Sequence, residues 1–408
     1  MSCGVIFSHP TGNAFVREAA LALAEARMLR EFHTTLAFFG SDWPSNLRRR
    51  VYPGSLKEFT RRHPWREAVR LASRRSGIGF LTRHEHGWAS VDAVYQSLDR
   101  RVATTLDPKN HSAVYCYEDG ALESFRSAER FKIPKIYDLP IGYWRAAQRI
   151  FLKEAQRRPE WASTIQGLRD SDAKLERKDA ELRLASRIVV ASSFTAQTLK
   201  DCPFPLAPVS VIPYGADEPC LETPPMRRDG PLRVLFVGSL SQRKGIAEVF
   251  ESVAAMGRHA ELTVIGRKTG APCKPLDNAL ARCRWIPSMP RDRILEEMRT
   301  HNVLLFPSLF EGFGLVVTEA LSQGLPVITT THTCGPDVIE DGVEGLLVPI
   351  SNAEAITEKL DLLDRDRSLL EAMRDAARRK ARSLSWADYR RRIVEVVSHT
   401  CMQSRRLA

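Results

Sequence analysis

The sequence predicts an α/β protein made of two consecutive domains, each a parallel sheet covered by helices. Three observations lead to this expectation. The chain has 408 residues, which is too long for one ordinary hydrophobic core. Short β-rich runs alternate with helical stretches from end to end, as in parallel sheets with crossover helices. A polar, proline-containing stretch at 217–230 interrupts the alternation, which then begins again.

The first half opens with a predicted strand at 4–8, a loop at 9–13 and a helix over 14–30. Further strands are expected at 34–39, 113–117, 135–137, 187–191 and 208–212. The charged stretch 146–184 contains Gly167 as its only glycine, so it is expected to be largely helical. Together these elements predict an N-terminal domain of residues 1–215.

The second half repeats the pattern over residues 228–385. Strands are predicted at 232–238, 262–266, 303–306, 326–329 and 346–348, and a helix at 245–255. The last stretch, 386–408, begins at Trp386 with helical spacing, and we expect it to cross back onto the first domain.

Composition and cysteine usage narrow the class of protein. With 43% hydrophobic and 27% charged residues, the chain is typical of a globular enzyme rather than a disordered protein. Its apolar runs are strand-length, and the start of the chain lacks the charged and apolar regions of a secretory signal. Eight cysteines are scattered without a CxxC pair, so we expect reduced thiols in a cytoplasmic protein.

The net charge of +11 is concentrated in the first half, where residues 1–215 carry 33 Lys+Arg against 23 Asp+Glu. Residues 45–83 alone hold 11 basic residues, with Glu58 and Glu67 as their only acids. One interpretation is a solvated helical face. The other is a surface for an anionic partner, and Trp65 and Leu71 among the charges favour the inner face of a membrane over nucleic acid. No RNA-binding motif accompanies the basic residues.

The segment 306–328 is the most informative, because it predicts a strand, a loop, a helix, a glycine and a second strand. A helix start offers unpaired N–H groups and a positive dipole end, which suit a diphosphate. Glycines allow the backbone to approach such a ligand closely. Glu319, one turn into the helix, is placed to accept hydrogen bonds from a ribose diol, and Glu311 from sugar hydroxyls. The plain alternative is a glycine turn before a helix whose glutamate only complements the dipole.

Several other signals are rejected. Asp170-Ser-Asp172 resembles a metal-binding pair, but it lies in the charged helical stretch and is interpreted as a solvated face. His84-Glu85-His86 lacks the spacing of a zinc helix, so no metal site is predicted. No P-loop is present, and no GxGxxG follows a strand, so an NTPase or a dehydrogenase has little support.

The spacing Glu311-x7-Glu319, with Gly-Phe-Gly-Leu between, resembles the signature of the retaining family 4 glycosyltransferases, which belong to the group 1 type. The runs 324–328 and 335–348 are also similar to that family. Upstream, 237–245 resembles its first phosphate-binding segment, and 211–217 its domain-closing motif. The resemblance covers roughly residues 185–350 and implies a GT-B fold, in which two Rossmann-like domains face each other across a cleft.

The resemblance implies the following roles. Arg243 and Lys244 contact the diphosphate of a nucleotide-sugar donor, Glu319 holds the ribose, and Glu311 holds the transferred sugar. The backbone amides expected close to the sugar and diphosphate are those of Gly312, Phe313, Gly314 and Leu315. The implied reaction is a retaining, metal-independent hexosyl transfer to a glycan, lipid-linked or other acceptor, with no cofactor beyond the co-substrate.

Two departures from the family concern the acceptor side and the diphosphate. Ser239 stands where the family usually has arginine. The family's histidine at the end of an N-terminal strand is also missing, and Asp119 and Asp138 stand at the corresponding strand ends as catalytic candidates. An aspartate after a strand is often simply a helix cap. Gly12 and Asn13 match the place where the family's first loop approaches the donor or acceptor.

Two other classes of function stay open at this point. A nucleotide-sugar epimerase on the same fold would turn over the donor with no acceptor present. A non-catalytic membrane-surface or scaffold protein would retain only a degenerate donor site.

Overall fold

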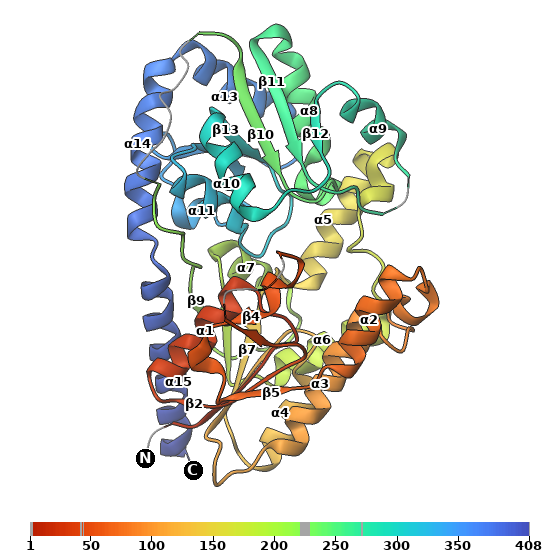
Figure 1. Cartoon of the computed structure of the whole chain (residues 1–408), viewed down its shortest axis with the longest axis vertical. Helices are drawn as coiled ribbons and strands as arrows, with labels where there is room; N and C mark the ends of the chain where they lie inside the picture. The colour runs from red at the N-terminus through yellow and green to blue at the C-terminus, as the bar shows by residue number, and fades with distance from the viewer. Residues whose placement is uncertain (1–2, 41–42, 44, 221–228, 271, 408) are drawn as a thin grey trace.

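The computed structural model describes residues 3–40, 43, 45–220, 229–270 and 272–407, and it confirms an α/β architecture with two parallel sheets (Figure 1). The first sheet has the order β5-β2-β1-β6-β7-β8-β9, and all of its pairings are parallel. Its strands are β1 (Val5–Ser8), β2 (Leu29–Thr34), β5 (Thr60–Arg62), β6 (Ala113–Tyr117), β7 (Lys135–Leu139), β8 (Arg187–Val190) and β9 (Val209–Val211). A separate short pair joins β3 (Phe38–Phe39) to β4 (Val51–Tyr52).

The second sheet has the order β12-β11-β10-β13-β14-β15 and is also parallel throughout. Its strands are β10 (Leu232–Val237), β11 (Ala260–Ile265), β12 (Arg284–Ile286), β13 (Val303–Phe306), β14 (Val327–Thr330) and β15 (Gly345–Val348). The central strands of both sheets are buried along their whole length, because helices cover both faces of each sheet.

Helices connect the strands of both sheets. The first half contains α1 (Ala14–Glu25), α2 (Trp65–Arg75), α3 (Val91–Thr105), α4 (Leu122–Arg130), α5 (Trp144–Arg157), α6 (Asp172–Leu184) and α7 (Ser193–Thr198). The second half contains α8 (Ile246–Ala255), α9 (Lys274–Leu280), α10 (Arg291–Thr300), α11 (Leu315–Ser322), α12 (Gly335–Val338), α13 (Ala353–Arg365), α14 (Arg367–Ser383) and α15 (Trp386–Leu407).

The first helix is shorter than the sequence predicts, and the strand expected at 34–39 begins earlier. Helix α1 ends at Glu25 because Arg27 adopts a left-handed conformation, with φ of 56°. The amide of Met28 then donates to the carbonyl of Leu23, which closes the helix end. Strand β2 follows at once, from Leu29 to Thr34. A glycine is the usual sequence signal for the end of a helix, and none is present here. The apolar pattern therefore predicts a helix that continues to residue 30.

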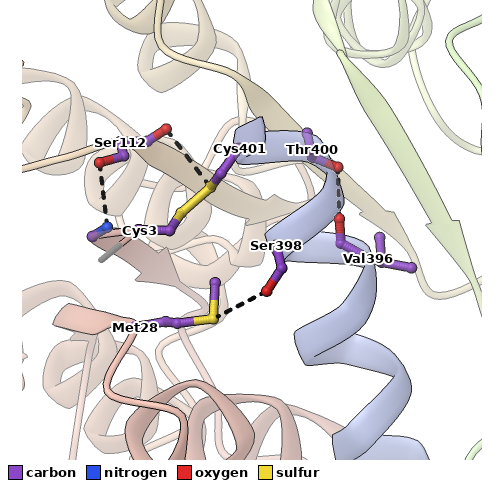
Figure 2. Close-up of a disulfide and its surroundings, with 8 residues drawn as sticks. Cys3, Met28, Ser112, Val396, Ser398, Thr400 and Cys401 are labelled. Atoms are coloured by element: carbon purple, nitrogen blue, oxygen red, sulfur yellow. Dashed lines mark hydrogen bonds between the residues drawn. A yellow bond between two sulfur atoms is a disulfide. The ribbon is translucent and has the colours of Figure 1, made fainter. Parts of the chain in front are cut away.

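The last helix, α15, lies beside α1, so the two ends of the chain meet at the same end of the molecule (Figure 1). A disulfide joins Cys3, just before β1, to Cys401 on α15 (Figure 2). The expectation that all eight cysteines are reduced is therefore wrong for this pair, and the other six are free thiols. The two cysteines are 398 residues apart in sequence, so their spacing carries no signal of the pairing.

Part of the first half packs on the second domain. Helix α5 extends toward α9 in Figure 1, and the short 3-10 helix η4 (Pro159–Thr164) follows it. Trp161 of η4 is buried in the core of the second domain, where it stacks on Phe250 with ring centroids 6.3 Å apart. Residues 221–228 of the expected linker lie outside the described residues. In the described part of the chain, no helix is long and apolar enough to cross a membrane.

Candidate functional site: two carboxylate–cation clusters at the edge of the second sheet

Two loops meet at the carboxyl edge of the second sheet. The first follows β10 and contains the 3-10 helix η6 (Gln242–Lys244), and the second runs from β13 to α11. Strands β10 and β13 are neighbours in the sheet, so the loops that follow them lie side by side. In open α/β sheets, ligands bind at this edge.

The first cluster consists of three predicted residues, namely the carboxylate of Glu311 and two cations that pair with it. Both Arg243 and Lys244 form ion pairs with Glu311, the latter at 2.5 Å between Nζ and Oε1. Ser308 donates a further hydrogen bond of 3.2 Å to Glu311, and Arg243 also donates to the carbonyl of Phe310 at 2.9 Å. The structure thus brings together the residues expected to bind the diphosphate and the sugar.

Burial sets the electrostatics of this cluster. Glu311 is 8% exposed and Lys244 is 9% exposed. Burial lowers the pKa of Lys244 to about 8, although the charge of Glu311 opposes the shift. For Glu311, burial acts to raise the pKa, but the charges of Arg243 and Lys244 outweigh it and hold the pKa below its usual value. Glu311 is therefore ionised at neutral pH and serves as the counter-ion of both cations.

The glycine loop that follows Glu311 is held between the two domains. Gly314 has φ of 95° and immediately precedes α11, which begins at Leu315 as the sequence predicts. A Cβ atom on Gly312 would overlap the carbonyl oxygen of Pro140, which follows β7 of the first domain. The carbonyl of Gly312 accepts hydrogen bonds from Ser192 (2.7 Å) and Thr195 (2.9 Å), and the Phe313 side chain is buried. The domains are thus in direct contact at this loop.

The second cluster surrounds Glu319 on α11. Arg291, the first residue of α10, donates from Nε to Glu319 at 2.8 Å and forms a second ion pair with Asp217. Burial raises the pKa of Glu319, against the effect of Arg291. Like Glu311, Glu319 is a carboxylate that a cation holds in place at the edge of the sheet.

The first loop of the N-terminal domain holds two further residues that the sequence predicts for the site, Gly12 and Asn13. Asn13 precedes α1 and its side chain makes no capping hydrogen bond. Gly12 packs so closely against the carbonyl of Arg49 that a Cβ atom would overlap it, and its own carbonyl accepts from Arg17 at 2.6 Å. Burial lowers the pKa of Arg17, and the positive charge of Arg291 acts in the same direction, against Tyr52 and Glu18.

The two N-terminal aspartates lie at the ends of neighbouring strands but differ in exposure. Asp138 is 2% exposed on β7 and accepts a hydrogen bond of 2.7 Å from the hydroxyl of Tyr115. Burial raises its pKa to about 7. Asp119 follows β6 with φ of 69°, is partly exposed, and has Lys178 3.9 Å away. Neither aspartate has a direct contact with Glu311, so their catalytic roles stay predictions.

A cavity of about 490 Å³ lies between the domains and reaches the first cluster at Arg243. Both halves of the chain line it: Trp144, Gln148 and Arg169 from the first, and Ser239, Ser241 and Thr269 from the second. Ser239, which stands where the resemblance implies an arginine, lines this cavity together with the cations Arg243, Arg169 and Lys178.

Residues rejected as metal ligands lie close together in the structure. Ligand atoms of His84, Glu85 and Asp170 are within 4.8 Å of one another. The ammonium group of Lys174 lies 3.0 Å from Asp170 and 2.9 Å from Asp92, and so supplies a positive charge to this cluster. We interpret the cluster as an ion-pair network. The sequence pattern indicates a solvated face for Asp170 instead.

Sequence reasoning missed several residues of this region. Arg291 lies in no motif, and its contacts depend on the packing of α10 against α11. Glu154 and Thr164 contact the loop that carries Lys244 from about 80 to 90 residues away in sequence. No local pattern in the sequence reports such contacts.

The fold and the two clusters define a two-domain α/β protein with carboxylates paired to cations at the edge of its second sheet. Residues 224–380 match the sequence model of a family described as "Glycosyl transferases group 1". The match covers the second domain and less than half of the chain. It includes Glu311, Arg243 and Lys244 of the first cluster and Glu319 of the second.

Two curated relatives each match about a third of the chain. The amylovoran biosynthesis glycosyltransferase AmsK of Erwinia amylovora is 30% identical over an alignment of 142 residues, and the match covers 31% of this chain and 34% of the relative. A D-inositol 3-phosphate glycosyltransferase of Corynebacterium glutamicum is 30% identical over an alignment of 168 residues, and the match covers 38% of this chain and 40% of the relative. The chain thus spans well under half the length of these relatives.

Solved structures are similar over nearly the whole chain. The sucrose-phosphate synthase of Thermosynechococcus elongatus superposes with a TM-score of 0.67 at 16% identity, covering 97% of this chain and 98% of that one. Anabaena HepE in complex with UDP gives a TM-score of 0.63 at 14% identity, covering 97% and 100%. At these identities the likeness shows the fold, which is the GT-B fold of two Rossmann-like domains.

Proposed function

We propose that this protein is a glycosyltransferase that moves a hexosyl group from a nucleotide-sugar donor to an acceptor. One observation carries the proposal. Two carboxylates, the buried Glu311 and the partly exposed Glu319, are each held by a cation at the edge of one sheet, on either side of a glycine loop that opens a helix. This spacing fits a donor whose diphosphate lies between its sugar and its ribose. The second-domain match to group 1 glycosyl transferases supports the proposal.

In this proposal, binding of the donor replaces the ion pairs that Arg243 and Lys244 form with Glu311 in the free protein. The diphosphate takes over Arg243 and Lys244, which frees Glu311 to accept hydrogen bonds from the sugar hydroxyls. The ribose diol binds Glu319. The two cations and the loop amides stabilise the charge that develops on the leaving phosphate, so the proposed transfer needs no metal. By resemblance the transfer retains the anomeric configuration, and the leaving phosphate takes the proton of the acceptor.

The donor site is tested by thermal shift with UDP, GDP, ADP and their sugars, because a ligand that binds only the folded state raises Tm. We expect one nucleotide to raise Tm in the wild type and to have no effect on Glu319→Ala. The control is Glu176→Ala, an exposed glutamate on α6, which should respond like the wild type. A full shift in Glu319→Ala would contradict the assignment of the ribose site.

We also propose that the protein binds the inner face of a membrane through a basic and aromatic surface of the first domain. On and near α2, Trp65 is 80% exposed and Phe80 is 74% exposed, while Ile78 is also exposed. The same segment, 45–83, carries exposed basic residues: Arg49, Lys57, Arg61, Arg62 and Arg83. Some of the basic residues of this segment form ion pairs within the protein, since Arg61 pairs with Glu31, and Arg50 and Arg70 both pair with Glu67. At a membrane, the basic side chains would contact the anionic headgroups, and the exposed aromatic rings would insert into the apolar layer below them.

The surface is tested by sedimentation with vesicles of phosphatidylcholine alone or with phosphatidylglycerol. We expect binding only to the anionic vesicles, and a loss of about tenfold in affinity for a Trp65→Ser, Phe80→Ser double variant, because apolar burial and charge act together. Leu362→Ser, an exposed apolar residue on α13, is the matched control. Equal binding to neutral vesicles would contradict the electrostatic part of the proposal.

A further inference from the structure

Residues 154–164 form an arm that reaches from the first half of the chain to the second domain. The arm consists of the end of α5 and the 3-10 helix η4. It packs against residues 241–245, here called the cation loop because they carry Arg243 and Lys244. On one side the cation loop faces Glu311, and on the other side it faces the arm.

Thr164, at the end of the arm, holds the start of the cation loop through two hydrogen bonds. Its hydroxyl accepts from the amide of Gln242 at 2.9 Å, and its carbonyl accepts from the hydroxyl of Ser241 at 2.7 Å. The Ser241 hydroxyl in turn accepts from the amide of Arg243 at 3.2 Å. Thr164 is fully buried, so water cannot replace it at the loop.

Gln242 is fully buried, and both atoms of its side-chain amide are hydrogen-bonded. Its Nε2 donates to Glu154 of the arm at 2.7 Å and to Glu248 of α8 at 2.7 Å. Its Oε1 accepts from the amide of Ala247 at 3.0 Å. The residue next to Arg243 is therefore fixed on one side by the arm and on the other by the first turn of α8.

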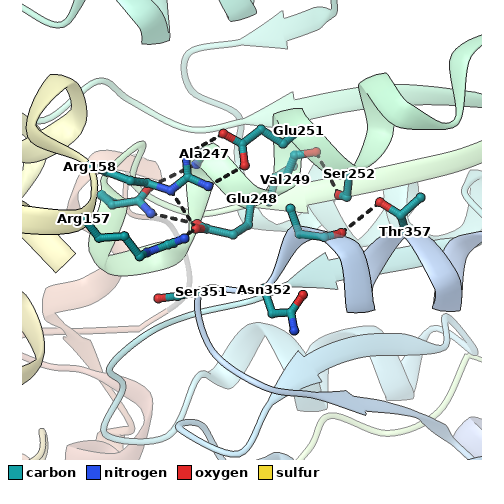
Figure 3. A network of polar contacts seen from close by, with 12 residues as sticks. Arg157, Arg158, Ala247, Glu248, Val249, Glu251, Ser252, Ser351, Asn352 and Thr357 are labelled. Atoms are coloured by element: carbon teal, nitrogen blue, oxygen red, sulfur yellow. Dashed lines mark hydrogen bonds and ion pairs between the residues drawn. The ribbon is translucent and has the colours of Figure 1, made fainter. Parts of the chain in front are cut away.

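Cations of the arm neutralise the acids that this arrangement buries. Glu248 is fully buried, and Arg157 and Arg158 both form ion pairs with it (Figure 3). Arg158 extends further to Glu251 on the next turn of α8. Because each buried carboxylate has a cation or an amide donor, the arm and α8 are held in one relative position.

We infer that Thr164 and Glu154 are positioning residues for the donor site, acting through the cation loop. They set the direction in which Arg243 and Lys244 face the diphosphate, and they do so from the opposite half of the chain. The inference rests on the proposed function, since it assigns the diphosphate to these two cations. The match to the family begins at residue 224, so the arm lies outside it.

The inference is tested with Thr164→Val, which keeps the side-chain shape but removes the hydroxyl. The Kd for UDP, GDP and ADP is measured by calorimetry, together with Tm. We expect the Kd of the preferred nucleotide to rise about tenfold in Thr164→Val, because the hydroxyl no longer accepts from the amide of Gln242 or donates to the carbonyl of Trp161. Thr164→Ser restores the hydroxyl and should restore the wild-type Kd. Glu154→Ala should raise the Kd in the same direction.

Ser124→Ala is the matched control, since Ser124 is fully buried and donates to Asp99 at 2.6 Å on the far side of the first domain. We expect it to lower Tm about as much as Thr164→Val while the Kd stays unchanged. If Thr164→Val lowers Tm but binds nucleotide like the wild type, the arm is merely structural and the inference is overturned. If the wild type binds none of the three nucleotides, the proposed function is overturned and this inference with it.

Discussion

Lys244 carries a charge although its side chain is largely buried, and this combination gives it an unusual pH dependence. Burial lowers its pKa to about 8, well below that of a lysine in water. Below pH 8 the ammonium group is present and available to a diphosphate. As pH rises through 8, the proton is lost from the free protein, and so is the attraction for the anion.

We therefore expect the affinity for the preferred nucleotide diphosphate to be constant from pH 6.5 to about 7.5 and to fall by roughly tenfold between about pH 8 and 9. Calorimetry across this range gives the profile. Lys244→Arg keeps its charge at every one of these pH values, so its profile should be flat. A wild-type profile that stays level up to pH 9.5 would contradict a role for Lys244 in binding the anion.

At the scale of elements, the loop between β13 and α11 is one of the places where the two domains touch. Gly312 has no room for a side chain, because a Cβ atom would overlap the carbonyl of Pro140. We expect Gly312→Ala to keep the domains from closing on each other and to lower kcat/KM for the donor by about a hundredfold, an effect of roughly 3 kcal/mol. Gly54→Ala is the control, since its Cβ position is open. Steady-state kinetics of the two variants give the comparison.

The two sheets were predictable because their strands are short apolar runs, and β6 and β13 begin and end where the sequence predicts. The loop at 311–314 was also predictable, since glycines mark it and a helix follows. The short edge strand β12 and the end of α1 were missed, because the first is only half-buried and the second lacks glycine. Contacts made by Arg291, Glu154 and Thr164 depend on tertiary packing that no local pattern encodes.

For the whole molecule, the disulfide between Cys3 and Cys401 joins the first strand to the last helix. Closing a loop of this length restricts the unfolded chain and stabilises the fold by at most about 6 kcal/mol in the chain-entropy account. We expect Cys401→Ser to lower Tm by several degrees, and dithiothreitol to lower the Tm of the wild type to the same value. Cys202→Ser, which removes a free thiol, should change Tm little. Mass spectrometry after alkylation should find six reactive thiols without reductant and eight with it. Eight in both cases would contradict the disulfide.

With that bond in place, the polypeptide from Cys3 to Cys401 is a closed covalent ring rather than an open line. A protease that cuts once anywhere within the ring yields a nicked molecule of nearly unchanged mass, whose two pieces separate only after reduction. Both pieces stay at the high local concentration that favours their reassembly. Damage to one peptide bond would then leave the two halves of the donor site tethered to each other.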